Sequence, residues 1–152
     1  MKRYLLPFIL FATSAGSLFG QSFQIMRFGI EDGLCHESTY TMNQDSDGFL
    51  WVGTSQGLCR FDGKSFTSDF IGDPLPSAIA NTSFIDGKGR AWFGYMDGLI
   101  NCFSANRMTL LEPAEGARFN VIGFIESQGK VIAITQQSGL IVINDELSMS
   151  YD

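Results

Sequence analysis

The sequence predicts an all-β protein made of four-stranded antiparallel units, the blades of a β-propeller. Short apolar runs alternate with Asp-Gly and similar turns, a strong hairpin signal because glycine adopts positive φ at no steric cost. A group of tryptophan, glycine and leucine residues recurs at a step of about 41 residues, which is typical of propeller blades. No stretch beyond residue 20 has sustained helical periodicity. The recurring positions are Trp51, Gly53, Gly57 and Leu58, then Trp92, Gly94, Gly98 and Leu99, then Gly139 and Leu140.

The first twenty residues have the three-part layout of an export signal. Lys2 and Arg3 precede an apolar run from Tyr4 to Ala12, and small residues follow. The run is too short to span about 30 Å of hydrocarbon comfortably, so we favour a cleaved signal over a retained anchor. Cleavage after Gly20 or after Ser17 fits the pattern. We therefore expect an exported, periplasmic chain.

The rest of the chain divides into a lead-in and three blades. Residues 21–36 form the lead-in, whose alternating run Phe23–Gly29 predicts a strand without a sequence partner of its own. Blade 1 covers 37–72, blade 2 covers 73–112 and blade 3 covers 113–152. The strands expected in blade 1 are Ser38–Gln44, Phe49–Thr54, Gly57–Phe61 and Ser65–Phe70, separated by turns at Asp47-Gly48, Ser55–Gly57 and Asp62-Gly63.

The second and third blades repeat this layout with growing divergence. At a step of 41, Ala133 takes the tryptophan position of blade 3 and Thr135 the position of Gly94. Proline at 74 and 76 keeps the segment before blade 2 out of a central strand. The strands expected are Ile79–Ile85, Arg90–Tyr95, Leu99–Phe103 and Met108–Leu111, then Phe119–Ile125, Val131–Thr135, Leu140–Ile143 and a last one beginning near Leu147.

Three blades do not close a ring, since propellers have about four to eight. We therefore expect an incomplete propeller, part of one with about seven blades. Either an amino-terminal piece of a longer protein or a truncated gene product accounts for this. The lead-in strand would then complete the closing blade. We expect this chain to pack against the remaining blades of the same propeller.

The first repeat closely resembles the two-component regulator propeller repeat. The nearly unbroken part runs from Gln44 to Gly63 and reads Gln-Asp-Ser-Asp-Gly-Phe-Leu-Trp-Val-Gly-Thr, three further residues ending in Gly57, then Leu58, Phe61, Asp62 and Gly63. Asp32-Gly33-Leu34 precedes it. The second repeat has Tyr95 where threonine is usual.

This resemblance implies the exported sensor region of a hybrid histidine kinase anchored in the inner membrane. The resemblance implies a parent protein in which propellers are followed by a small β-sandwich, a membrane helix and a histidine kinase. Many respond to oligosaccharides, and other members carry a diguanylate cyclase. The resemblance also implies a homodimeric parent. Any kinase activity lies outside these 152 residues, so we expect no enzyme activity and no cofactor in this chain.

Two clusters of polar side chains are candidate sites. Asp45-Ser46-Asp47-Gly48 resembles the start of a calcium loop, but its twelfth position is Gln56 rather than glutamate, so a turn capped by Asp45 is favoured. Cys35-His36-Glu37 has no second ligand pair for zinc. His36 and Glu37 are kept as candidate ligand contacts, because loops entering the innermost strands ring a propeller channel. Catalytic and metal-binding residues are not expected.

The composition argues against nucleic-acid binding and leaves other functions open. The net charge is −6 without a basic cluster, which argues against contact with nucleic acid. Cys35, Cys59 and Cys102 have no spacing that favours a pair, so three buried free thiols are expected. We expect a glycan-sensing propeller. The alternative is a non-signalling exported propeller in type IX secretion or surface binding, and a glycan lyase or hydrolase would need an acid–base pair not visible here.

Overall fold

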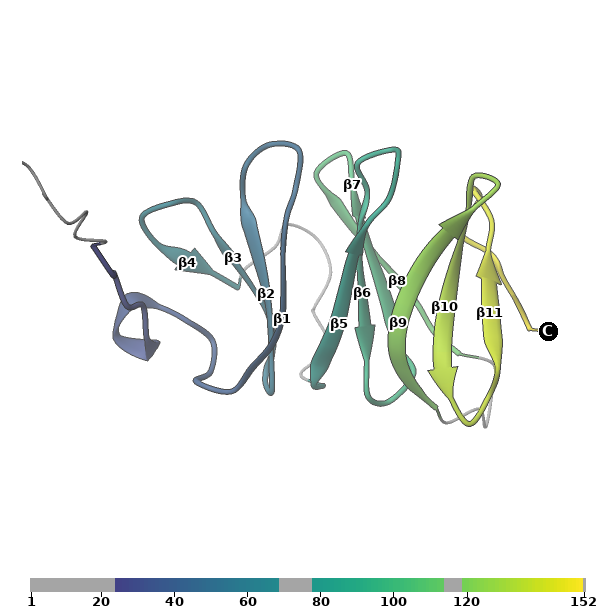
Figure 1. Ribbon diagram of the computed structural model, residues 1–152, viewed down its shortest axis with the longest axis horizontal. Helices are drawn as coiled ribbons and strands as arrows, with labels where there is room; N and C mark the ends of the chain where they lie inside the picture. Colours follow the sequence, from purple (N-terminus) through teal and green to yellow (C-terminus); the bar gives the residue numbers. More distant parts are fainter. Residues whose placement is uncertain (1–23, 69–77, 114–118, 152) are drawn as a thin grey trace, which may run out of the picture.

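A computed structural model describes residues 24–68, 78–113 and 119–151 of the chain. These residues form three four-stranded antiparallel sheets that stand side by side in chain order (Figure 1). Apart from one short 3-10 helix, η1 (Ile30–Asp32), each regular element described is a strand, which confirms the all-β prediction. The described part contains no helix long and apolar enough to span a membrane. The predicted export signal lies outside it.

Each sheet follows the simple up-and-down order of its sequence and lies within the range predicted for its blade. The fourth strand of the first sheet is described only over Phe66–Thr67. The strands are β1 (Thr39–Gln44), β2 (Leu50–Thr54), β3 (Gly57–Phe61) and β4 (Phe66–Thr67); β5 (Ala80–Ile85), β6 (Ala91–Tyr95), β7 (Ile100–Ser104) and β8 (Arg107–Leu111); β9 (Asn120–Ser127), β10 (Lys130–Gln136), β11 (Leu140–Ile143) and β12 (Met149–Tyr151).

The hydrophobic core lies between neighbouring sheets, in two seams. Trp51 belongs to the cluster between the first and second sheets, and Trp92 to the cluster between the second and third. Both indoles are fully buried. β6 reads as apolar on both faces because the second sheet packs between the first and the third, whereas β2 packs on a described sheet through its Trp51 face only. The two-sided apolar run of β6 is therefore explained by sheet stacking.

Two glycines set how closely the sheets approach. A Cβ added to Gly53 would lie 2.5 Å from the carbonyl oxygen of Ala80, on the innermost strand of the next sheet. A Cβ on Gly94 would lie 2.5 Å from Val121 Cγ1 in the same way. Contacts this short do not occur for real Cβ atoms, so the recurring Trp-x-Gly pattern encodes the packing of one sheet onto the next.

The described part of the lead-in does not pair as a strand in this chain, and its predicted place in a closing blade stays a prediction. Within the described part of the run, residues 24–29 have no ladder partner, and the chain turns through η1 instead. Asp32 closes this turn, since its carboxylate accepts a hydrogen bond from the Gly29 N–H at 2.8 Å. Alternating side chains alone do not make a strand, because a strand also needs an adjacent edge to pair with.

The repeat step of 41 residues is off by one in the third sheet. Ile134 pairs with Leu140 as Gly94 pairs with Ile100, and Ala133 pairs with Ile141 as Phe93 pairs with Asn101. Ile132 therefore occupies the position of Trp92, and Ala133 faces the second sheet. The cause is the β9–β10 turn, where Glu126 pairs with Val131, five residues on, whereas Ile85 pairs with Ala91, six residues on. A one-residue shift moves each side chain to the other face of a sheet.

The β2–β3 turn also varies in length. Thr54 pairs with Gly57, whereas Tyr95 donates its N–H to the carbonyl of Leu99, so that Ile100 rather than Leu99 takes the ladder position of Leu58. In the third sheet Thr135 donates to Gly139 in the same manner. Gly57, Gly98 and Gly139 all have φ between 73° and 96°. The glycines thus recur because a turn needs a left-handed residue, although their ladder registers differ.

Candidate functional site

The three sheets present two ends, which differ in chemistry. β1, β5 and β9 begin at the lower end in Figure 1, here called the entry end. The turns that follow these strands lie at the upper end, here called the turn end. Of the three loops that lead into the innermost strands, only the first is described in full. Its predicted equivalents are residues 73–77, which lie outside the described residues, and residues 112–118, of which 114–118 lie outside them.

His36 and Glu37 lie in that first loop, at the entry end. His36 Nδ1 accepts a hydrogen bond from the Ser38 N–H at 2.9 Å, which fixes the ring against its own backbone. The Ser38 carbonyl in turn accepts from the Ser55 N–H at 3.0 Å, so the loop is tied to the β2–β3 turn. His36 is half-buried, whereas Glu37 is exposed. The pair is placed where a ligand can reach it, and its role stays a prediction.

A disulfide connects this loop to the first sheet, and here the sequence interpretation was wrong. Cys35 is bonded to the fully buried Cys59 of β3, with their Cα atoms 6.0 Å apart. The 24-residue separation gives no hint of this, because only the return of the lead-in across the sheet brings the thiols together. Cys102 is a buried free cysteine, as expected. Burial raises the pKa of its thiol to about 12, so it remains protonated at neutral pH.

Each innermost strand carries a β-bulge close to its beginning. The irregularities lie between Thr39 and Thr41, between Ala80 and Thr82, and opposite Ile134 and Thr135. The residues left between the paired positions are Tyr40, Asn81 and Ile122, of which Tyr40 and Ile122 are each about half exposed. Bulges often re-aim side chains beside functional sites. The same structural position thus carries three different side chains, as a ligand-specific surface would.

Polar side chains join the innermost strands to one another. Ser83 Oγ lies 2.6 Å from Thr41 Oγ1 and accepts a hydrogen bond from Asn43 Nδ2 at 2.7 Å. In the next seam, Asn81 Nδ2 donates to Asn120 Oδ1 and to the Val121 carbonyl, both at 2.9 Å. Asn81 Oδ1 is buried and has no hydrogen-bond partner. The inner edge is therefore hydrogen-bonded between sheets, with one acceptor left open beside a bulge.

At the turn end, aspartate side chains close the turns and bond buried tryptophans. Asp45 Oδ1 accepts hydrogen bonds from the Asp47 and Phe49 N–H groups, and its Oδ2 accepts from Trp51 Nε1 at 2.7 Å. Asp86 repeats this arrangement, with Trp92 Nε1 donating at 2.9 Å. One aspartate therefore closes a turn and satisfies a buried indole. The sequence carries this signal as an aspartate six residues before each tryptophan, and sequence reasoning recognised the turn role of Asp45 but missed its bond to the indole.

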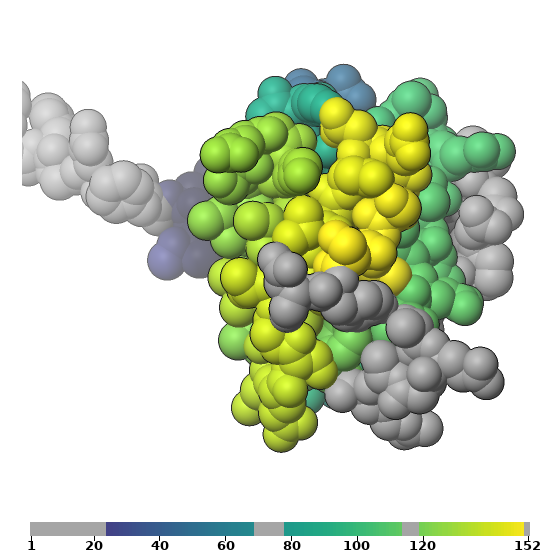
Figure 2. All heavy atoms as spheres, turned by 90° about the vertical axis from the view of Figure 1, so that its right-hand side faces the viewer, coloured from purple at the N-terminus to yellow at the C-terminus, as the bar shows by residue number. Residues whose placement is uncertain are grey.

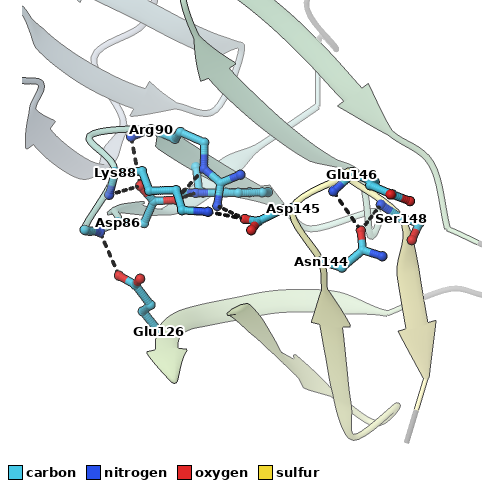
Figure 3. Close-up of polar contacts among 10 residues, drawn as sticks. Asp86, Lys88, Arg90, Glu126, Asn144, Asp145, Glu146 and Ser148 are labelled. Atoms are coloured by element: carbon cyan, nitrogen blue, oxygen red, sulfur yellow. Dashed lines mark hydrogen bonds and ion pairs between the residues drawn. The ribbon is translucent and has the colours of Figure 1, made fainter. Parts of the chain in front are cut away.

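Asp86 is also the centre of a charged cluster between the second and third sheets (Figure 3). Arg90 Nε donates to Asp86 Oδ2 at 2.6 Å, and Asp145 of the third sheet accepts from Lys88 Nζ. Burial raises the pKa of Asp86, but hydrogen bonds from Trp92 and Arg90 and the charge of Arg90 outweigh it and hold that pKa below its usual value. Glu126 accepts from the Gly87 N–H at 2.7 Å. These contacts clamp two sheets together.

In the first and third sheets, the turn between the third and fourth strands is also closed by a side-chain oxygen. Asp62 Oδ1 accepts from the Lys64 and Ser65 N–H groups at 2.8 Å, which lowers the pKa of this exposed carboxyl, and Gly63 has a φ of 96°. Asn144 accepts from the Glu146 and Ser148 N–H groups at 3.0 Å (Figure 3). Among the described residues no group of three or more His, Cys, Asp and Glu side chains forms a metal site. Asp47 and Gly48 lie in the β1–β2 turn and Asp62 and Gly63 in the β3–β4 turn, where both glycines have positive φ.

Comparison with known proteins identifies the repeat. The family model "Two component regulator propeller" matches residues 33–56, which confirms the predicted resemblance: this chain carries a two-component regulator propeller repeat. A protein named histidine kinase P4, from Formosa agariphila, is 45% identical over 60 residues. That match covers 38% of this chain and 4% of the kinase.

Solved structures share the fold. An extracellular domain assigned to a hybrid two-component system of B. thetaiotaomicron superposes with a TM-score of 0.73 at 15% identity, covering 90% of this chain and 19% of that domain. A second such domain from the same organism gives 0.65 at 22% identity, covering 87% and 18%. A catalytically inactive virginiamycin B lyase from Staphylococcus aureus, solved with quinupristin, gives 0.62 at 15%, covering 77% and 42%. The chain thus spans less than a fifth of the two extracellular domains it matches.

Proposed function

We propose that this chain is the beginning of an exported propeller that senses a ligand for a hybrid two-component histidine kinase. The observation that carries the proposal is the regulator propeller repeat at residues 33–56, directly behind a sequence with the layout of an export signal. The similarity in fold to two extracellular domains assigned to hybrid two-component systems supports it. Periplasmic location, the inner-membrane anchor and the kinase of the parent protein are parts of this proposal.

The ligand surface of this proposal is the entry end. The His36–Glu37 loop is exposed there beside the bulge residue Tyr40, and the side chains at equivalent positions differ from sheet to sheet. Hydroxyl, amide, imidazole and carboxylate groups next to an exposed aromatic ring suit an oligosaccharide, which needs both hydrogen bonds and a flat apolar surface. Binding there would shift the equilibrium between two arrangements of paired sensor domains and so bias the kinase. This chain itself needs no catalytic group for that role.

Calorimetric titration of the complete exported region with a panel of plant-derived and host-derived oligosaccharides tests the ligand class. We expect at least one to bind, and we expect His36→Ala and Glu37→Gln to weaken that binding by about tenfold each, the loss of one hydrogen bond to a polar ligand. Asp47→Asn, at the turn end, is the matched control and should leave affinity unchanged. Equal affinity in all variants would move the site elsewhere.

Signalling needs a separate measurement on the full protein in vesicles. Ligand that binds should change the rate of autophosphorylation, and His36→Ala should lose this response. Binding without any change in phosphorylation would instead favour a non-signalling surface-binding propeller. Chemical change of the oligosaccharide during incubation would overturn our expectation that this region is not an enzyme.

A further inference from the structure

The loop that leads into β1 differs from its two predicted equivalents because a disulfide attaches it to its sheet. It carries Cys35, which is bonded to Cys59 of β3 with the Cα atoms 6.0 Å apart. The equivalents, residues 73–77 and 112–118, contain no cysteine. The chain has three cysteines in all, and the third, Cys102, is buried in β7. The loop that contains the single histidine of the chain is therefore also the one loop of the three that a disulfide can hold.

The disulfide is an addition to the first sheet and is not part of the repeat. Ladder register identifies the position of Cys59 in the other two sheets as Asn101 and Ile141. Both of these side chains are almost fully buried. Asn101 donates a hydrogen bond to the Tyr95 hydroxyl at 3.0 Å, and Ile141 packs in the cluster of Trp92. Two sheets of the same architecture thus form without a covalent bond at this position, so the four-stranded unit itself does not require one.

The disulfide and one backbone hydrogen bond fix the two ends of a short span. At one end, Cys35 is bonded to β3. At the other end, the Ser38 carbonyl accepts a hydrogen bond at 3.0 Å from the Ser55 N–H of the β2–β3 turn. Both anchors belong to the β2–β3 hairpin, and only His36 and Glu37 lie between them. The two candidate contact residues therefore form a bridge between two fixed points on one hairpin.

The same span orients the ring of His36. Its Nδ1 accepts a hydrogen bond from the Ser38 N–H at 2.9 Å. A ring nitrogen that accepts carries no proton, so Nε2 of the neutral ring is the atom that is left to donate to a ligand. The direction of this donor depends on Ser38, and the position of Ser38 depends on the anchors of the span.

Hydrogen bonds alone would hold this span weakly. The net contribution of one hydrogen bond is small, because water competes for the same groups, and surface loops open locally far more often than the sheets that they connect. A loop that becomes ordered only when a ligand binds loses part of the binding affinity to that ordering. A covalent bond at one end reduces this loss, because it restricts the alternative arrangements of the loop before the ligand arrives.

We propose that the Cys35–Cys59 bond is a positioning device that keeps His36 and Glu37 in the arrangement that binds an oligosaccharide, an inference that rests on the ligand surface proposed above. Without the bond, the loop occupies this arrangement for only part of the time, and the apparent affinity falls in proportion to that fraction. The two cysteines do not contact the ligand in this role. The bond therefore controls how fast a ligand is captured, whereas His36 and Glu37 control how long it stays bound.

Amide hydrogen exchange in the complete exported region tests the anchor without any ligand. Cys35→Ala combined with Cys59→Ala should speed exchange of the Ser38 and Ser55 amides by about tenfold, while the ladder amides of the third sheet stay unchanged. Cys102→Ala is the matched control, since it removes a buried cysteine and leaves the loop attached. Equal exchange at Ser38 and Ser55 in the parent and the double variant would overturn the proposal. So would an equal acceleration in all three sheets, which would assign the bond to overall stability.

Surface plasmon resonance with the oligosaccharide panel tests the effect on binding. For each panel member that the parent binds, the double cysteine variant should lower the association rate constant by about tenfold and leave the dissociation rate constant nearly unchanged. His36→Ala removes a contact and should mainly raise the dissociation rate constant. An unchanged association rate constant in the double variant would contradict the positioning role. If the parent binds no panel member, the proposed function fails, and the exchange measurement still decides whether the bond holds the loop.

A second variant keeps the test decisive if removal of the cysteines prevents folding. Insertion of two glycines directly after Cys35 keeps the disulfide and the sheet, but it lengthens the span that carries His36 and Glu37. This variant should slow association as removal of the bond does, while its midpoint of thermal unfolding stays close to that of the parent. Association as fast as in the parent would show that the position of the loop does not matter for binding, and the proposal would fall.

Discussion

The second and third sheets differ in what each offers to the sheet that follows it. The second sheet presents a buried tryptophan held by an aspartate, and a glycine that admits the next innermost strand. The third sheet has Ile132 and Ile134 at the same ladder positions, and it has neither the aspartate nor the glycine. Figure 2 looks at the molecule from the third-sheet end, where the strands of that sheet lie toward the viewer. Aspartate, tryptophan and glycine disappear together, so they act as one packing unit.

This comparison separates two roles that the repeat combines. Turn glycines persist in all three sheets, because every hairpin needs a left-handed residue. The aspartate, tryptophan and Trp-x-Gly glycine persist only where the following sheet packs closely. An element that packs on the third sheet therefore meets branched aliphatic side chains and cannot approach the backbone as β5 and β9 do.

The largest expected difference concerns the buried ring. Trp51→Ala should lower the free energy of unfolding by about 3–5 kcal/mol, because it leaves a cavity in the first seam and removes the donor to Asp45. Ile132→Ala, at the same position in the third sheet, should cost less than about 1.5 kcal/mol, since that side chain is only half-buried. Urea unfolding of the full chain measures both. Similar losses would break the comparison.

The close-approach glycine comes next. Gly53→Ala should cost about 1–3 kcal/mol, because its Cβ would lie 2.5 Å from a backbone oxygen that cannot rotate away. Gly123→Ala in the third sheet is the matched control, since the nearest atom to its Cβ is Ile134 Cδ1 at 3.7 Å, an ordinary contact. The midpoint of thermal unfolding should fall for Gly53→Ala and stay nearly constant for the control. Equal shifts would show that the glycine does not set the spacing.

The last effect, no larger than that of the glycine, depends on pH. The folded-state pKa of Asp86 is lowered, so its stabilising effect is complete above the unfolded pKa of about 3.9 and is lost as pH falls through the lower folded value. Asp86→Asn should therefore cost about 1–3 kcal/mol at pH 7 and flatten the acid limb of the stability curve. Asp145→Asn, exposed on the surface, should change stability at neutral pH much less than Asp86→Asn does, because solvent screens its ion pair. Stability measured from pH 7 to pH 2 tests both, and an unchanged acid limb would assign the acid sensitivity to other carboxylates.

Predictions from the sequence succeeded where local chemistry was decisive. Asp-Gly turns and two-sided apolar runs placed the twelve strands of the described residues in three sheets, because both signals act within a few residues. The lead-in has no strand edge to pair with among the described residues, so its place in a closing blade stays a prediction. The prediction failed for Ala133, because a turn shorter by one residue reverses which side chains face the neighbour. For the candidate site, the sequence indicated only the loop that contains His36 and Glu37, and the bulge residues beside it came from the structure.

The sequence by itself determined the fold class, the repeat and the relation to two-component regulator propellers, since turn residues and buried strand residues are read locally. Only the tertiary structure decided the Cys35–Cys59 bond and the aspartate–indole pairs. These contacts join residues that are brought together by the stacking of sheets and by the return of the lead-in over the first sheet. The spacing of residues along a chain records its turns, whereas contacts between faces depend on where those turns send the chain.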